Sequence, residues 1–89
     1  MVVVATVDAH SGAVLAGPDI INRGFVFHET ADDLLEEARA LTLKTLEASA
    51  ADEVTDQTVI KQSIRRDLGR YFFEITQRKP VIVPVIMTV

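Results

Sequence analysis

The last eleven residues, from Lys79 to Val89, form an alternating segment in which both sets of alternate positions are apolar. Read as a strand, the segment places valine and methionine on one face, and isoleucine, proline and threonine on the other. A strand with two apolar faces is typical of a sheet that is covered on both sides. The rest of the chain predicts only two helices, which are enough to cover one side. We therefore expect the second side to dock on another surface.

The N-terminal part of the chain predicts a hairpin with an irregular second arm. Val2–Asp8 is β-branched and apolar, as in a strand, and Gly12 suits a turn residue with a positive φ. The second arm is extended on either side of residues 17–19, Gly-Pro-Asp, which predict a bulge or a turn. Extended character returns at Phe25–Phe27.

A first helix is predicted to begin at Thr30 and to end near Ser49 or Ala50. The Thr30 hydroxyl suits an N-cap, and Asp33 stands at the third helical position, as in a capping box. The apolar stripe of this helix is formed by Leu34, Ala38, Leu41 and Thr45.

A second helix is predicted from a cap at Thr55 or Asp56 to about Gln77, because Pro80 disfavours continuation of a helix. Gly69 lies inside this helix at a cost of about 1 kcal/mol relative to alanine, and we expect close backbone packing to compensate for it. The predicted core stripe is Ile60, Ile64, Leu68, Phe72 and Ile75.

The order β-β-α-α-β predicts a two-layer α+β domain, a three-stranded sheet with two antiparallel helices on one face. The last strand pairs either with the first, in parallel, or with the second, in an antiparallel sheet. Pro84 places it at an edge or at a bulge. The alternative to docking is that residues 13–21 fold back over the second face. The candidates for an exposed apolar interface are Val2, Val4, Val83, Val85 and Met87.

Composition narrows the class of protein. The 89 residues suit a single domain, and the absence of cysteine fits a reducing compartment and excludes thiolate metal sites. The chain shows no signal peptide, and no apolar run approaches the roughly 18 residues of a membrane helix. We expect a soluble, cytoplasmic protein with no membrane partner.

The net charge of −4 conceals a basic second half, since residues 57–89 carry six bases and two acids. The basic candidates on the second helix are Lys61, Arg65, Arg66 and Arg70. They predict either a solvated face, paired with acids such as Asp67, or a surface that contacts RNA phosphates. Arg65 and Arg66 lie about 100° apart on a helix, so we expect them not to face one point.

The remaining motifs carry little chemistry. Asp8 and His10 supply too few donors for a metal site, which needs three or four, and we expect an ordinary turn there and a surface position for His28. Residues 23–27 resemble the start of the aromatic strand of an RRM, but the element order differs, so we expect Phe25 and Phe27 to pack in the core. No catalytic set and no P-loop is present in the sequence.

Four segments in order, PDIINRGFVF, LLEEAR, DLGRYFFEITQRKP and VIVPVIM, resemble the C-terminal domain of ribonuclease J over nearly the whole chain. The resemblance implies a parent enzyme of the metallo-β-lactamase class with a β-CASP insertion. Such an enzyme cuts RNA endonucleolytically and from 5′ to 3′, in mRNA turnover and rRNA maturation. Its two zinc ions are bound by an HxHxDH motif.

This chain lacks the zinc motif, so the resemblance supplies no catalytic residue, metal ligand or cofactor for it. It implies instead a C-terminal domain that is linked to dimer formation and to full activity of the parent. We expect Met1 to mark a fragment without the catalytic domains. The expected partners are the parent's catalytic core, a second copy, and RNA through the parent. The alternative is an accessory RNA-binding domain that uses the four basic candidates.

Overall fold

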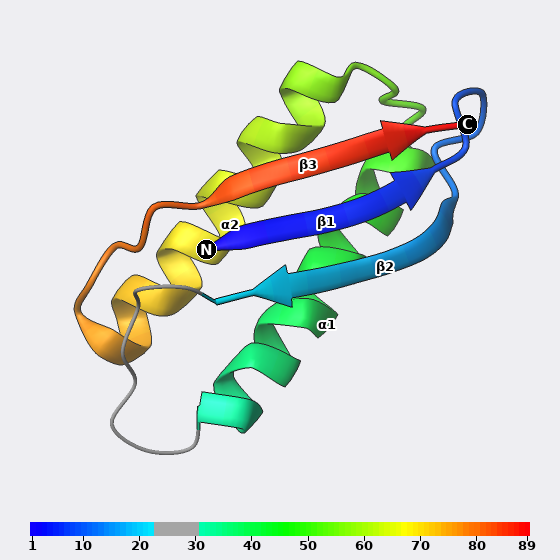
Figure 1. Cartoon of the computed structure of the whole chain (residues 1–89). Coiled ribbons are helices and arrows are strands. Elements are labelled where there is room, and N and C mark those ends of the chain that lie inside the picture. Colours follow the sequence, from blue (N-terminus) through cyan, green and yellow to red (C-terminus); the bar gives the residue numbers. More distant parts are fainter. Residues whose placement is uncertain (23–30) are drawn as a thin grey trace.

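Three strands and two helices form two layers in the computed structural model, which describes residues 1–22 and 31–89. Both helices lie side by side against the same face of the sheet (Figure 1). The order confirms the predicted β-β-α-α-β arrangement and the α+β class. The elements are β1 (Val2–Val7), β2 (Val14–Ile21), α1 (Ala31–Ala51), α2 (Gln57–Thr76) and β3 (Val83–Thr88).

The strand order is β2-β1-β3, so the last strand pairs with the first. β1 and β3 run parallel in an unbroken register from Val2 opposite Val83 to Val7 opposite Thr88. The N–H of Val83 donates to the carbonyl of Met1 at 2.9 Å. Backbone N–H groups of successive residues in a strand point to opposite sides, so the nitrogen of the next residue, Pro84, faces the open edge of the sheet. No N–H donor is needed there, because no further strand pairs with this edge in the described sheet. This confirms the predicted edge position of the last strand.

The predicted interruption of the second arm is a bulge in β2. Val4 lies opposite Asp19 and Thr6 lies opposite Ala16, so two residues of β2 face one residue of β1. Gly17 adopts a φ of 79°, and a Cβ built there would lie 2.7 Å from the carbonyl oxygen of Val4. Glycine is therefore required at this position. The predictions for Phe25, Phe27, His28 and Thr30 fall outside the described residues.

Capping residues set the limits of α2. The Oδ1 of Asp56 accepts hydrogen bonds from the N–H groups of Thr58 and Val59, at 2.8 and 3.4 Å. This identifies Asp56 as the N-cap. At the other end, Gln77 is left-handed with a φ of 58°, and its N–H donates to the carbonyl of Phe73 at 2.9 Å. Both limits agree with the prediction to within one residue.

The core lies between the sheet and the two helices. From α2 it takes the predicted Ile60, Ile64, Leu68 and Phe72, all of which are buried. The prediction for Ile75 is wrong, because its side chain is 49% exposed. Figure 1 shows the reason: the last turn of α2 extends past the start of β1, beyond the sheet that would cover it. In α1 the fully buried Thr42 donates to the carbonyl of Ala38 at 2.8 Å, which makes its hydroxyl compatible with the core.

The expectation of close packing at Gly69 is also wrong. Apart from its chain neighbours and the adjacent backbone of α2 itself, no described atom lies within 4 Å of a Cβ built at this position, whereas the equivalent atom at Gly17 would clash with the backbone. The glycine in α2 therefore leaves open space on the helix surface and serves no packing contact with the described residues.

We predict that Gly69→Ala raises the free energy of unfolding by up to about 1 kcal/mol, because alanine loses less backbone entropy in a helix and meets no obstacle here. Gly17→Ala is the matched comparison and should destabilise the chain, because its φ and its 2.7 Å approach forbid a Cβ. Urea denaturation of both variants measures the difference. A loss of stability in Gly69→Ala would contradict this description of α2.

Candidate docking face and basic groove

One face of the sheet is covered by the helices, and none of the described helices covers the other. On the covered side, Val3, Ala5 and Val7 of β1 are buried, and Ile82 and Ile86 join them. The alternate residues point to the opposite side. We call this uncovered surface the outer face, and it is formed by Val2, Val4, Ile21, Val83, Val85 and Met87.

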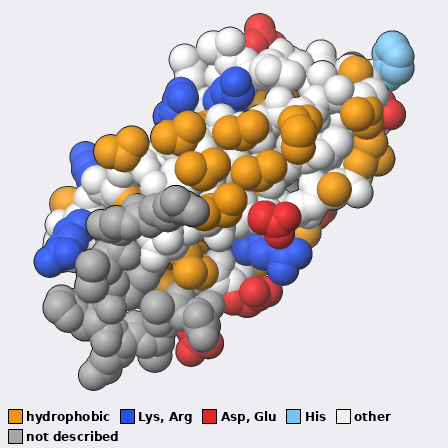
Figure 2. Space-filling model, in the orientation of Figure 1, with side chains coloured by type: hydrophobic (Ala, Val, Ile, Leu, Met, Phe, Trp, Pro, Cys, Tyr) orange, Lys and Arg blue, Asp and Glu red, His pale blue; other side chains and the backbone are white. Residues whose placement is uncertain are grey.

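All five predicted interface residues lie on the outer face. Val83, Val85 and Met87 are 45%, 40% and 48% exposed, while Val2 and Val4 are half-buried because the central strand is flanked by both neighbours. Figure 2 views this face directly and shows hydrophobic side chains gathered across its middle. Residues 14–21 do not fold back over it, since they form β2 within the same sheet. Monomeric proteins rarely expose contiguous apolar surface of this kind, so the outer face is a candidate for docking.

A second feature, the basic groove, runs between α2 and the segment that leads into β3. The groove has a volume of about 520 Å³. Lys79, Pro80 and Ile82 line one side. From α2 come Arg65, Arg66, Gly69, Arg70 and Phe73. The open space at Gly69 is thus part of this groove.

The groove bears on two expectations about the basic residues. Arg65 and Arg66 both contribute to its lining, and Arg66 also lines a second pocket together with Thr45 and Asp67. Lys61 does not line it, so only three of the four predicted RNA-contact candidates come together. Lys79 was missed as a partner of these arginines. Its ammonium lies 5.3 Å from the centroid of the Phe73 ring, a cation–π contact.

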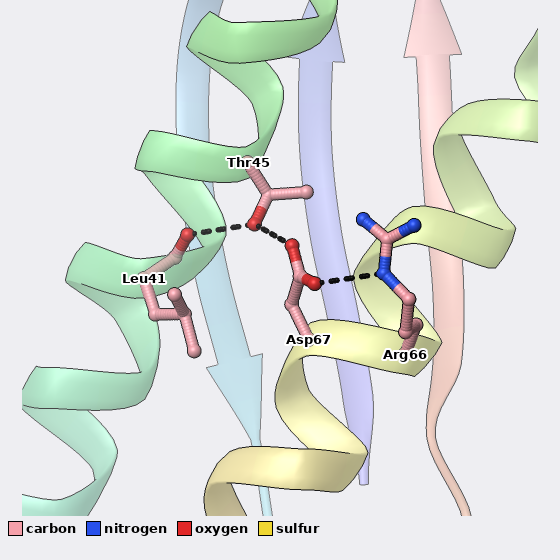
Figure 3. Close-up of polar contacts among 4 residues, drawn as sticks. All are labelled: Leu41, Thr45, Arg66 and Asp67. Carbon is pink, nitrogen blue, oxygen red and sulfur yellow. Dashed lines mark hydrogen bonds and ion pairs between the residues drawn. The ribbon is translucent and has the colours of Figure 1, made fainter.

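A chain of polar contacts links Arg66 of α2 to α1 (Figure 3). The Thr45 hydroxyl lies 2.8 Å from Oδ2 of Asp67 and 3.0 Å from the carbonyl of Leu41. The Nε of Arg66 donates to the other carboxylate oxygen, Oδ1 of Asp67, at 3.0 Å. This is the pairing expected from the first of the two alternatives, a solvated face paired with acids. Among residues 1–22 and 31–89, Arg65 and Arg70 form no ion pair.

These contacts shift two pKa values in opposite directions. Partial burial acts to raise the pKa of Asp67, but the hydrogen bonds from Thr45 and Arg66 outweigh it and hold the pKa below its usual 3.8. Partial burial, together with Glu37, raises the pKa of Tyr71 well above its ordinary value. The Tyr71 hydroxyl donates to Oε2 of Glu37 at 2.7 Å. Glu37 precedes Thr45 in α1, whereas its partner Tyr71 follows Asp67, the partner of Thr45, in α2. The two contacts therefore confirm that α1 and α2 are antiparallel.

The Asp8 carboxylate serves the hairpin turn. Its Oδ1 accepts hydrogen bonds from the N–H groups of His10 and Ser11, both at 2.8 Å. These bonds hold the pKa of Asp8 below its ordinary value. Gly12 completes the turn with the predicted positive φ, 77°.

Within the described parts of the chain, no three His, Cys, Asp or Glu side chains come together to hold a metal ion. No described helix is long and apolar enough to cross a membrane.

A family model described as the ribonuclease J C-terminal domain matches residues 1–89. The chain belongs to this family. Curated relatives agree: the protein named ribonuclease J 2 of Staphylococcus aureus strain NCTC 8325 is 36% identical over 85 residues. The protein of the same name from Staphylococcus epidermidis is 35% identical over 85 residues. In both comparisons the alignment covers 96% of this chain and 15% of the relative. The chain therefore spans only a small part of the length of the relatives it matches.

The pKa of Asp67 generates a test of the polar chain. Because this pKa is lower in the folded than in the unfolded state, ionised Asp67 stabilises the fold above about pH 5. The stabilisation is lost as the pH falls through the folded value. We predict that Thr45→Val raises the pKa of Asp67 toward 3.8, since the carboxylate loses its hydroxyl donor. Titration of the carboxyl carbon by NMR measures it. Thr58→Val, an exposed threonine of the same helix as Asp67, is the control, and equal pKa values in both variants would contradict the assignment.

Proposed function

We propose that this chain is a non-catalytic assembly domain of a ribonuclease J-type enzyme, and that its outer face packs against the same face of a second copy. The observation that carries the proposal is the outer face itself. It is apolar, lies on regular strands and is left uncovered by both helices. Sheets pack face to face at about 10 Å through such residues.

A second copy suits the outer face because the face is almost free of charge. In the described strands, its one ionisable side chain is Asp19, opposite Val4 on β2. Two identical faces can therefore meet about a two-fold axis with no row of like charges in contact. The basic groove lies beside β3, at the margin of the sheet, and stays outside this contact. Packing of the outer face on the parent's catalytic portion is the competing arrangement.

By this proposal, hydrolysis of RNA belongs to the catalytic portion of the enzyme. The zinc ions implied by the family resemblance would reside there as well. The described residues of this chain do not fit a zinc site, because no three suitable donors converge. The chain's own contribution is to hold two enzyme molecules in a fixed relative orientation. The outer face is available for this contact because the core lies on the other side of the sheet, between the sheet and the two helices.

We predict that Val85→Lys converts a dimer of this chain to a monomer, because it places a charge in the middle of the apolar contact. Val59→Lys is the matched control. Val59 has a similar exposure, 44% against 40%, but it lies on α2. Light scattering after size exclusion measures the molar mass of each variant. An apolar contact also predicts that the dimer persists in high salt.

The same substitutions in the full-length enzyme separate the two arrangements. Monomeric enzyme with Val85→Lys and dimeric enzyme with Val59→Lys would support the self-association. An isolated chain that is monomeric before any substitution would reject it. If the isolated chain is monomeric and the full-length enzyme nevertheless loses activity with Val85→Lys, the outer face packs on the catalytic portion instead.

A further inference from the structure

We propose that the basic groove is a binding site for single-stranded RNA, in which the arginines contact phosphates and Phe73 stacks on a base. This inference goes beyond the assembly role and does not rest on it, since it concerns a different surface. The first support is charge. Arg65, Arg66, Arg70 and Lys79 line one groove in a chain whose net charge is −4, so the cations are concentrated at this place. A groove of this kind follows a nucleic-acid backbone.

The second support is the aromatic ring that lines the same groove. Phe73 lies on α2 and is 43% exposed, although a phenylalanine is usually buried. Its present partner is the Lys79 ammonium, 5.3 Å from the ring centroid. A base that stacks on the ring would displace this ammonium toward an adjacent phosphate, and both contacts are favourable. Exposed rings beside cations are the usual platform for single strands.

The third support is Gly69. It weakens α2, yet outside the adjacent backbone of this helix no described atom lies within 4 Å of the position of its missing Cβ. The glycine therefore has no packing reason, and the space it leaves is inside the groove. A ligand can approach the helix backbone closely at this point, which is a common reason for glycine at a binding site.

The fourth support is the availability of Arg66 and its neighbours. The Nε of Arg66 donates to Asp67, but the side chain is 64% exposed, and one of its five donors is used in this contact. Arg65 and Arg70, which form no ion pair with the described residues, have all their donors for a ligand. An acidic protein segment would use the cations, but neither the exposed ring nor the notch at Gly69. RNA uses all three, and the relatives of this chain are named ribonucleases.

Fluorescence anisotropy of a labelled ten-nucleotide oligouridylate, measured against the whole 89-residue chain over a range of salt, tests the proposal. Arg65→Ala/Arg70→Ala should weaken binding at least about tenfold and lower the slope of log affinity against log salt by about 1.4, for two lost phosphate contacts. Lys61→Ala should leave both unchanged, since Lys61 lies on the same helix but outside the groove.

Gly69→Gln separates the groove from a diffuse basic surface. Glutamine is a better helix former than glycine and adds no charge, so the variant should be at least as stable as the parent chain. It should nevertheless weaken binding several-fold with an unchanged salt slope, because it fills the notch. Phe73→Leu should weaken binding of the oligouridylate at least about fivefold and leave an abasic oligomer of equal length unaffected.

Three outcomes would overturn the proposal. The first is that the unsubstituted chain does not bind the oligouridylate at low salt. The second is that Lys61→Ala weakens binding as much as Arg70→Ala, which would indicate a diffuse charged face, and the third is that polyglutamate of equal charge binds as tightly as RNA, which would assign the groove to an acidic protein segment. None of these readings depends on the oligomeric state, so a failure here is distinct from a failure of the docking face.

Discussion

The parallel pairing of β1 with β3 is the constraint on which the rest of the structure depends. It joins residues at the two ends of the sequence, from the Met1 amine, 2.9 Å from the carbonyl of Val81, to the N–H of Val89, 3.1 Å from the carbonyl of Val7. Because β1 also pairs with β2, it becomes the central strand of the sheet, with a neighbour on both sides. The connection through α1 and α2 then returns along one face of the sheet (Figure 1), and that face becomes the core.

The other features follow from this one-sided arrangement. With only two helices, the chain has nothing in its described part to cover the outer face, and the apolar alternation of β1 and β3 remains exposed there. Placing β3 at the edge brings α2 and the segment before β3 together, and the basic groove forms between them. The two surfaces are distinct, so the proposed self-association and the proposed contact with RNA would not exclude each other. The Thr45–Asp67–Arg66 chain links the two helices.

Much of the fold could be predicted from local signals. The Asp56 cap, the bulge at residues 17–19 and the stripe Ile60–Phe72 each follow from chemistry within a few residues. The exposure of Ile75 could not be foreseen, since it depends on how far the sheet extends beneath α2. The groove could not be foreseen either, because Lys79 and Arg65 line it together only where the chain passes from α2 into β3. From the sequence, Gly69 suggests close packing, and only its surroundings show the open space.

The central claim is that the outer face is a self-association surface, and methyl NMR on dilution tests it most directly. The spectra would be recorded at the concentrations where the dimer dissociates. The account predicts that shifts change for Val2, Val4, Val83, Val85 and Met87, while the methyl groups of Ile64 and Leu68, buried beneath the helices, stay constant. Changes confined to the surface of α1 or α2, or no change at any concentration, would contradict it.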